Sequence, residues 1–299
     1  MPRDHLPLAI LLRLSSVLAF ALMNVGIKLA EAGGAVLGEI MFWRQAGAAL
    51  LIAGILAAGP GFGTVRTSRI GAHVGRTALG LVAMTLTFTT LTLLPLAEAT
   101  TLGFSMPIFA TVLGALVLRE PTGWWRWGAV LAGFAGVVIV ARPGSAGILP
   151  LGIVTGLGAA LGTATVSILL RTLGKTERPL STVFWFSVLS LVPLGGVYLI
   201  VAGAHPPAVW AVLLGIGLLG GLGQLAMTSS LTLGPVSSVV PMDYSALLWA
   251  TLFGWWVFGR WPAETTWIGA PVIVASGLVI VWREQVRRRD EARQAVLEG

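Results

Sequence analysis

The sequence predicts an all-α polytopic membrane protein, with ten transmembrane helices built from two inverted five-helix repeats. Three observations predict it: the composition, the distribution of charge, and an internal repeat. Of the 299 residues, 56% are hydrophobic and 10% are charged, and the mean hydropathy is +0.89. So few charged side chains cannot cover the surface of a soluble fold of this size. About ten helices of roughly 20 residues each would place most of the chain in a bilayer.

Apolar runs, separated by glycine, proline or charged residues, give five candidate spans in each half of the chain. Those of the first half extend over residues 6–30, 36–58, 72–94, 96–118 and 124–141. Those of the second half extend over residues 148–173, 180–202, 208–233, 236–258 and 265–282. Only Pro95 separates the third and fourth runs, and only Gly234-Pro235 separates the eighth and ninth. A proline at such a point could instead kink one helix, so these two breaks need independent support.

The charge distribution supplies that support. If the N-terminus is cytoplasmic, only four of the 19 lysine and arginine residues fall in outside segments or near outer span ends: Lys28, Arg44, Arg142 and Arg260. Cytoplasmic loops are enriched in basic residues, so this asymmetry favours ten spans with both termini in the cytoplasm. Merging either proline-broken pair would move the C-terminal arginine cluster outside. We therefore expect a multi-pass protein of the bacterial inner membrane.

An internal repeat relates the two halves. A shift of 141 residues aligns Arg119 with Arg260, Gly128 with Gly269 and Gly136 with Gly277, and Pro95 matches Pro235 at a shift of 140. Because each unit has an odd number of spans, the second copy must enter the membrane from the opposite side. We expect residues 1–145 to form the first repeat, and residues 146–299 to form the second with a basic cytoplasmic tail. Inverted repeats are common among secondary transporters.

Several short motifs resemble the EamA-type half of the drug/metabolite transporter superfamily. They are Ile27-Lys28-Leu29, Phe42-Trp43-Arg44, and Leu118-Arg119-Glu120-Pro121-Thr122 followed by Gly128 and Gly136. The resemblance extends from about Leu8 to Trp282. It implies ten helices, a central cavity between the halves, and export of amino acids, other small metabolites or toxic analogues. The second copy departs from the pattern, because Arg260-Trp261-Pro262 stands where a Gly-Glu pair is usual.

The sequence gives no support for an enzyme, a cofactor or a metal site. There is no cysteine, and His5, His73 and His205 are far apart in sequence. Residues 215–220 match a dinucleotide-binding glycine pattern, but they lie in an apolar span, where close helix packing explains them better. The net charge of +7 reflects the basic loops, so no nucleic-acid partner is expected. Besides the lipid bilayer, we expect a small-molecule substrate, with the chain a monomer or a weak homodimer.

Ionisable groups within spans are costly and usually face the interior or a water-filled path. Asp243, in the ninth span beside Tyr244, is the strongest functional candidate; a structural pair with another helix is the alternative. Glu98 in the fourth span is either a gate or coupling group, or a solvated helix terminus. Lys28 and Arg44 are expected to extend toward the membrane interface or to pair with nearby glutamates.

Uncharged residues complete the expected binding site. Asn24, Ser167 and Gln224 can each form hydrogen bonds with a substrate. An apolar and aromatic lining is expected from Met84, Phe88 and Phe104, although core packing would produce the same residue types.

These observations predict a secondary transporter that exports small metabolites, most specifically neutral or aromatic amino acids and their analogues. Alternating access by facilitated diffusion or exchange is expected, because one intramembrane carboxylate gives thin support for obligatory proton coupling. A lipid flippase, or a proton-coupled drug or cation exporter of the same fold, remains an alternative.

Overall fold

The computed structural model describes residues 6–116, 124–141, 149–173, 176–233 and 240–297, and within these ranges the chain is helical with no strand. The all-α fold class is confirmed. The first half comprises α1 (Leu6–Ala32), α2 (Leu37–Ala58), the short 3-10 helix η2 (Phe62–Val65), α3 (Ile70–Leu93), α4 (Leu96–Gly103), α5 (Met106–Leu116) and α6 (Trp124–Ala141). The second half comprises α7 (Pro150–Leu173), α8 (Pro179–Val201), α9 (Pro207–Leu233), the 3-10 helix η3 (Val240–Ser245), α11 (Ala246–Phe258) and α12 (Glu264–Leu297).

These helices make the chain a multi-pass membrane protein. Eight helical segments of the described part are long and apolar enough to cross a bilayer, counting α4 and α5 as one, and α6 contributes a shorter apolar stretch. The predicted break at Pro95 is confirmed, since α3 ends at Leu93 and α4 begins at Leu96. The corresponding break at Gly234-Pro235 lies outside the described residues.

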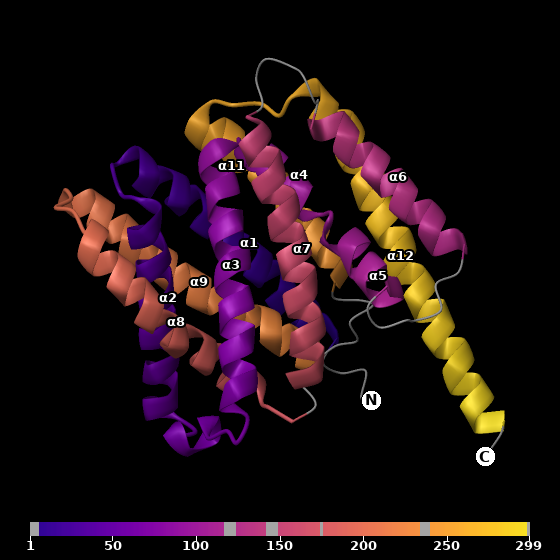
Figure 1. Ribbon diagram of the computed structural model, residues 1–299, viewed down its shortest axis with the longest axis horizontal. Helices are drawn as coiled ribbons and strands as arrows, with labels where there is room; N and C mark the ends of the chain where they lie inside the picture. The colour runs from indigo at the N-terminus through magenta and orange to yellow at the C-terminus, as the bar shows by residue number, and fades with distance from the viewer. Residues whose placement is uncertain (1–5, 117–123, 142–148, 174–175, 234–239, 298–299) are drawn as a thin grey trace.

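Successive spans run in alternate directions, and α1 begins at the end of the molecule where α12 finishes (Figure 1). We call this the terminal end. The connections from α2 to α3 and from α7 to α8 also lie there, whereas those from α3 to α4 and from α11 to α12 lie at the opposite end (Figure 1).

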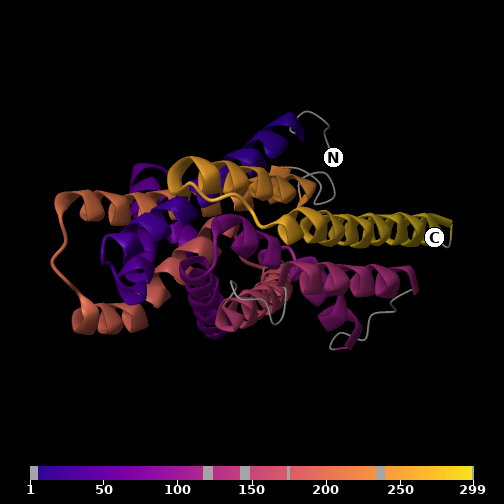
Figure 2. The ribbon, with the colours of Figure 1, turned by 90° about the horizontal axis from the view of Figure 1, so that it is seen from above.

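The helices pack in a reciprocal pattern across the two halves. α1 packs along α9, while α7, the counterpart of α1, packs along α3, the counterpart of α9. α2 packs against α8, and α6 runs beside α12 at one side of the bundle (Figures 1 and 2). Two copies related by a pseudo-two-fold axis produce this exchange of partners.

Glycine permits two of the closest contacts between the halves. A β-carbon on Gly47 of α2 would lie 2.6 Å from the α-carbon of Gly217 of α9. One on Gly269 of α12 would lie 2.7 Å from the carbonyl oxygen of Gly136 of α6. Gly217 belongs to the glycine pattern of residues 215–220, so helix packing accounts for that glycine, as the sequence predicts.

Candidate transport site

The fourth and ninth spans both lose regular helix at matching positions. α4 ends at Gly103 and α5 starts at Met106, whereas η3 runs through Ser245 before α11 begins. Phe104-Ser105 and Tyr244-Ser245 are 140 residues apart, which is the shift that relates Pro95 to Pro235. The Phe104 and Tyr244 rings meet edge to face, with centroids 5.1 Å apart. Interrupted helices at equivalent positions of two repeats commonly mark the substrate site of a transporter.

A cavity of about 270 Å³, which we call the central cavity, lies beside this interruption. One face of α1 lines it with Arg13, Ser16, Val17, Phe20, Ala21 and Asn24. The other walls are Leu96, Thr100, Gly103 and Phe104 of span four, Met227 of α9, and Asp243, Ala246 and Ala250 of span nine. The α1 residues extend over about 16 Å in the middle part of that helix. The central cavity therefore lies well inside the bundle.

An ion pair lies in the wall of the central cavity, near the part of α1 that is closest to the terminal end. Arg13 donates from Nε and Nη2 to the two carboxylate oxygens of Asp243, which joins α1 to η3. The Arg13 side chain is 8% exposed and that of Asp243 is 37% exposed. Asp243 thus lines the central cavity, as expected of a functional residue, and it also forms the pair with another helix that the sequence offers as the alternative.

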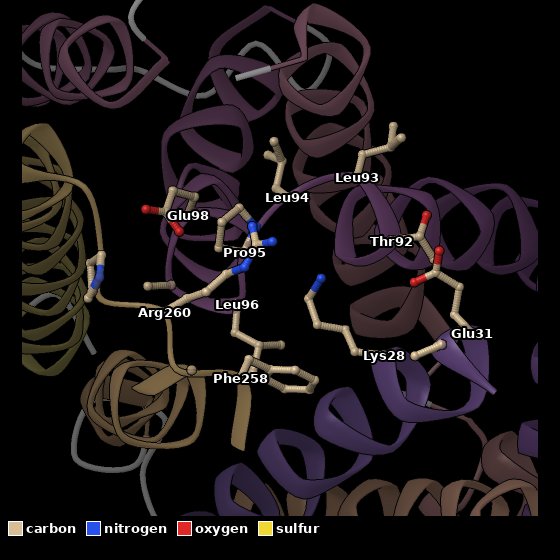
Figure 3. A pocket seen from close by; sticks show the side chains of 14 residues that line it. Lys28, Glu31, Thr92, Leu93, Leu94, Pro95, Leu96, Glu98, Phe258 and Arg260 are labelled. Atoms are coloured by element: carbon tan, nitrogen blue, oxygen red, sulfur yellow. The ribbon is translucent and has the colours of Figure 1, made fainter. Parts of the chain in front are cut away.

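A second cavity of about 270 Å³, the outer cavity, is lined by residues of the α3–α4 and α11–α12 connections, which lie at the opposite end (Figure 1). Lys28 from α1 and Arg260 from the α11–α12 connection extend into it, and the Glu31 carboxylate lies beside Thr92 (Figure 3). Leu96 lines both cavities and is 3% exposed. The two cavities are therefore arranged in series along α1, with Leu96 in the wall between them.

Glu98 lines the outer cavity but is held to the start of α12. Its Oε1 accepts hydrogen bonds from the Ala263 amide at 2.9 Å and from the Thr266 hydroxyl at 3.3 Å. Glu98 is 3% exposed, so it is not a solvated helix terminus. Its Oε2 has no partner among the described residues.

The structure brings together only some of the residues that the sequence singles out. Asn24, Phe104 and Asp243 line the central cavity. Tyr244 is not among the lining residues, but its ring packs against that of Phe104. Met84 and Phe88 lie in the buried apolar core and line neither cavity. Ser167 donates its hydroxyl to the Thr163 carbonyl of its own helix. Gln224, on α9, lies outside both linings as well.

Sequence reasoning missed Arg13, Ser16, Phe20 and Thr100, which also line the central cavity. The signal that could have found the first three is their spacing, because with Asn24 they recur at intervals of three or four on one helix face.

The expectation for Arg44 is wrong. Arg44 does not extend to the membrane interface, because it is 7% exposed, and its guanidinium donates to the Gln45 side chain. Nor does it pair with Glu39, whose carboxylate accepts hydrogen bonds from the Val36 and Gly203 amides and contacts the His205 ring.

A second carboxylate joins the halves at the terminal end. Glu177, between α7 and α8, accepts a hydrogen bond from the Thr67 hydroxyl at 2.6 Å and lies 3.6 Å from Nε2 of His73. The hydrogen bond from Thr67 and the charge interaction with His73 lower the pKa of Glu177 from its ordinary value of 4.5. This carboxylate fixes the α2–α3 connection to the α7–α8 connection.

The inverted pattern of packing and the two cavities in series define a membrane transporter of the two-repeat kind. The chain belongs to the EamA-like transporter family, whose model matches residues 7–142 and again residues 150–282. Proteins of this family that resemble the chain are named as transporters and not as enzymes.

Three curated relatives illustrate the similarity. The chain is 32% identical over 282 residues to a riboflavin transporter of Rhizobium johnstonii, and this alignment covers 92% of this chain and 91% of that protein. It is 30% identical to a riboflavin transporter of Vibrio cholerae, over 76% of this chain and 77% of that protein. It is 26% identical to an S-adenosylmethionine uptake transporter of Rickettsia felis, over 75% and 76% of the two chains. A solved crystal structure shares the fold, with a TM-score of 0.63 and 19% identity over 95% of this chain and 98% of that one.

Proposed function

We propose that the protein transports a planar heteroaromatic metabolite of the riboflavin class through the central cavity. The observation that carries the proposal is the pair of aromatic side chains, Phe20 and Phe104, on the walls of a cavity well inside the bundle. The flat face of a fused ring system packs well against such side chains. The riboflavin transporter of Rhizobium johnstonii, 32% identical over 92% of this chain, supports the same class of substrate.

The polar groups of the central cavity suit the edge of such a ring system. The Asn24 amide can donate and accept hydrogen bonds, and the Thr100 hydroxyl can do both as well. A few polar groups in a mainly apolar lining fix the orientation of a bound ligand. The volume of about 270 Å³ is near the lower end of the ~300–1,000 Å³ typical of small-molecule sites, so we expect one ligand to occupy it.

We place the protein in the bacterial inner membrane with both termini in the cytoplasm, on the basis of its basic loops. The outer cavity then faces the periplasm and Leu96 is the gate between it and the central cavity. The Arg13–Asp243 pair is the corresponding gate on the cytoplasmic side. Alternating access requires one gate to open while the other stays closed. Because Asp243 is engaged by Arg13, we favour facilitated diffusion or exchange over obligatory proton coupling.

Counterflow in proteoliposomes tests the proposed substrate. Vesicles loaded with unlabelled riboflavin should accumulate labelled riboflavin, and excess external phenylalanine or tryptophan should not compete. Accumulation of labelled aromatic amino acids without riboflavin would contradict the proposal and support the amino-acid substrates expected from the sequence. Labelled S-adenosylmethionine is tested in the same counterflow assay, because other relatives are named as S-adenosylmethionine uptake transporters.

A matched pair of variants assigns the transport to the central cavity. Phe104→Ala should lower riboflavin counterflow strongly, because it removes one aromatic wall. Phe109→Ala is the control, since Phe109 belongs to the same interrupted span but packs against Phe134, with ring centroids 5.7 Å apart, and lines neither cavity. Equal loss in the two variants would show that the central cavity is not the substrate site.

A further inference from the structure

Two arginines are buried inside the bundle between α2, α3 and α8. Arg44 is 7% exposed and Arg76 is 4% exposed. Their guanidinium carbons lie 5.7 Å and 3.6 Å from the centroid of the same ring, Phe186 of α8. Each arginine is about 10 Å along its helix from the nearer helix end. Two positive charges are thus held close to one ring, away from the surface of the molecule.

No carboxylate in the described part of the chain compensates these charges. The ion pairs found there involve Arg13, His73 and His205, and neither Arg44 nor Arg76 has an acidic oxygen within 4.0 Å. Arginine stays protonated in proteins, so it cannot relieve the cost of burial by losing its proton. The attraction between a cation and an aromatic face offsets only part of that cost.

Several buried polar atoms of the two arginines and of their neighbours in sequence also lack a hydrogen-bond partner among the described residues. Nε of Arg44 and both Nε and Nη1 of Arg76 are buried without a partner in the described residues. The same holds for the Gln45 side-chain nitrogen and the hydroxyl of Thr77, each adjacent in sequence to one of the arginines. Buried polar groups are nearly always satisfied in native proteins, and clustered exceptions indicate an unseen water or ion. Since most of these groups are donors on cations, an anion matches them best.

We propose that a small inorganic anion, of the size and charge of chloride, binds at the Arg44–Arg76 pair. The Gln45 side chain, whose oxygen accepts a hydrogen bond from Arg44, is available as a further donor beside it. None of these three residues lines the central or the outer cavity, so the anion site is separate from the proposed substrate site. That neither cavity reaches the pair also favours a small ion over a metabolite.

The Arg44–Arg76 pair lies at a contact between the two halves. Arg44 and Arg76 belong to the first half, while Phe186 belongs to the second. Phe186 follows Arg44 by 142 residues, as Phe184-Trp185 follows Phe42-Trp43, so the arginine of one copy faces a phenylalanine at the matching place in the other. An anion bound there stabilises the folded state, by an amount that grows with the logarithm of its concentration once this exceeds the dissociation constant.

Thermal unfolding of the full chain in neutral detergent tests the site. Sodium gluconate is replaced stepwise by sodium chloride at constant ionic strength, and the Tm is read from intrinsic tryptophan fluorescence. The Tm of the wild type should begin to rise when chloride reaches its dissociation constant and should then increase with the logarithm of the chloride concentration. The chloride concentration at which this rise begins should increase about tenfold or more in Arg76→Gln, which corresponds to the loss of one charge-assisted contact. Arg260→Gln, which alters a cation of the outer cavity, should keep the onset concentration of the wild type.

Other results of the same titration, together with a second anion and further variants, decide whether the anion site exists. A wild-type Tm that is the same in gluconate and chloride over the whole series would overturn the proposal, whatever the variants do. Stabilisation by acetate without stabilisation by chloride would also overturn it, and would assign the arginines to a carboxylate on an organic ligand. If Arg76→Gln does not fold, Arg76→Lys and Arg44→Lys replace it, and an unchanged onset concentration of chloride in both would count against the site.

Discussion

Replacing Asp243 with asparagine should destabilise the protein more than replacing Arg13 with glutamine. The reason is the unequal exposure of the pair, because the Arg13 side chain is 8% exposed and that of Asp243 is 37% exposed. Asp243→Asn leaves a buried guanidinium without its counterion, whereas Arg13→Gln leaves a carboxylate that water can reach. The two changes therefore remove the same contact at different cost.

The magnitude follows from the two limiting cases. Breaking a fully buried ion pair costs about 3–5 kcal/mol, and breaking an exposed one costs about 0.2–1 kcal/mol. With one partner buried and the other partly solvated, we expect about 2 kcal/mol for Asp243→Asn. For Arg13→Gln we expect about 1 kcal/mol or less, near the exposed limit.

Equilibrium unfolding by SDS titration of the wild type, both single variants and the double variant measures these values. The cycle should give a favourable coupling energy of about 1 kcal/mol, typical of residues in contact. A cost for Arg13→Gln that equals or exceeds that of Asp243→Asn would refute the reasoning from exposure. A coupling energy near zero would refute the ion pair itself.

Three further changes test other parts of the structure. The chain has no cysteine, so Thr100→Cys provides a single thiol reporter in the central cavity. A charged thiol reagent added from the outer side should modify this cysteine slowly. When Leu96→Ala removes the gate, the rate should rise at least about tenfold, which corresponds to a change of about 1.4 kcal/mol in the opening equilibrium. An unchanged rate would show that Leu96 is not the barrier. Glu98→Ala should lower stability by about 1–3 kcal/mol, because it leaves buried donors at the start of α12 without an acceptor, and SDS unfolding at neutral pH measures this. A loss within error of zero would contradict that role. The hydrogen bond from Thr67 lowers the pKa of Glu177 in the folded state below its ordinary value of 4.5. The Glu177 carboxylate therefore stabilises the protein above pH 4.5. This contribution should disappear as the pH falls from 4.5 through the lower pKa of the folded state. The Tm of Glu177→Gln should therefore fall less than that of the wild type in this acidic range, and parallel curves would exclude the contribution.

Hydropathy and charge predict the fold well because the bilayer imposes one simple rule on every span. Each helix must be apolar over about 20 residues, and the basic residues must gather at one side. Pro95 illustrates the success: it looks like a minor irregularity in one long apolar stretch, yet the charge count requires a chain reversal there, and the structure has one.

The same uniformity hides the candidate site. Every span is apolar almost all round, so the sequence does not show which side of a helix faces a cavity. Met84 and Phe88 have the same character as Phe104, but only Phe104 lies at the interruption of a span. The interruption of span four, at Phe104-Ser105, has no proline within it, although Pro107 follows closely, whereas η3 in span nine contains Pro241.

Charged residues show a second limit. Arg13 and Asp243 are 230 residues apart, and only the packing of α1 against η3 brings them together. Arg44 has Glu39 nearby in sequence, but Glu39 is already engaged by the α8–α9 connection. Partners of buried charges in a bundle are chosen by tertiary packing, so proximity in sequence predicts them poorly.

The central claim is that the central cavity binds a planar heteroaromatic substrate between aromatic walls. Titration of the purified protein with riboflavin, followed by quenching of flavin fluorescence, measures this most directly. The account predicts saturable quenching by the wild type and by Phe109→Ala, with a Kd raised about fivefold to tenfold in Phe104→Ala, since one stacked ring contributes about 1–1.4 kcal/mol. Equal Kd values in the wild type and Phe104→Ala, or no saturable quenching by folded protein, would contradict it.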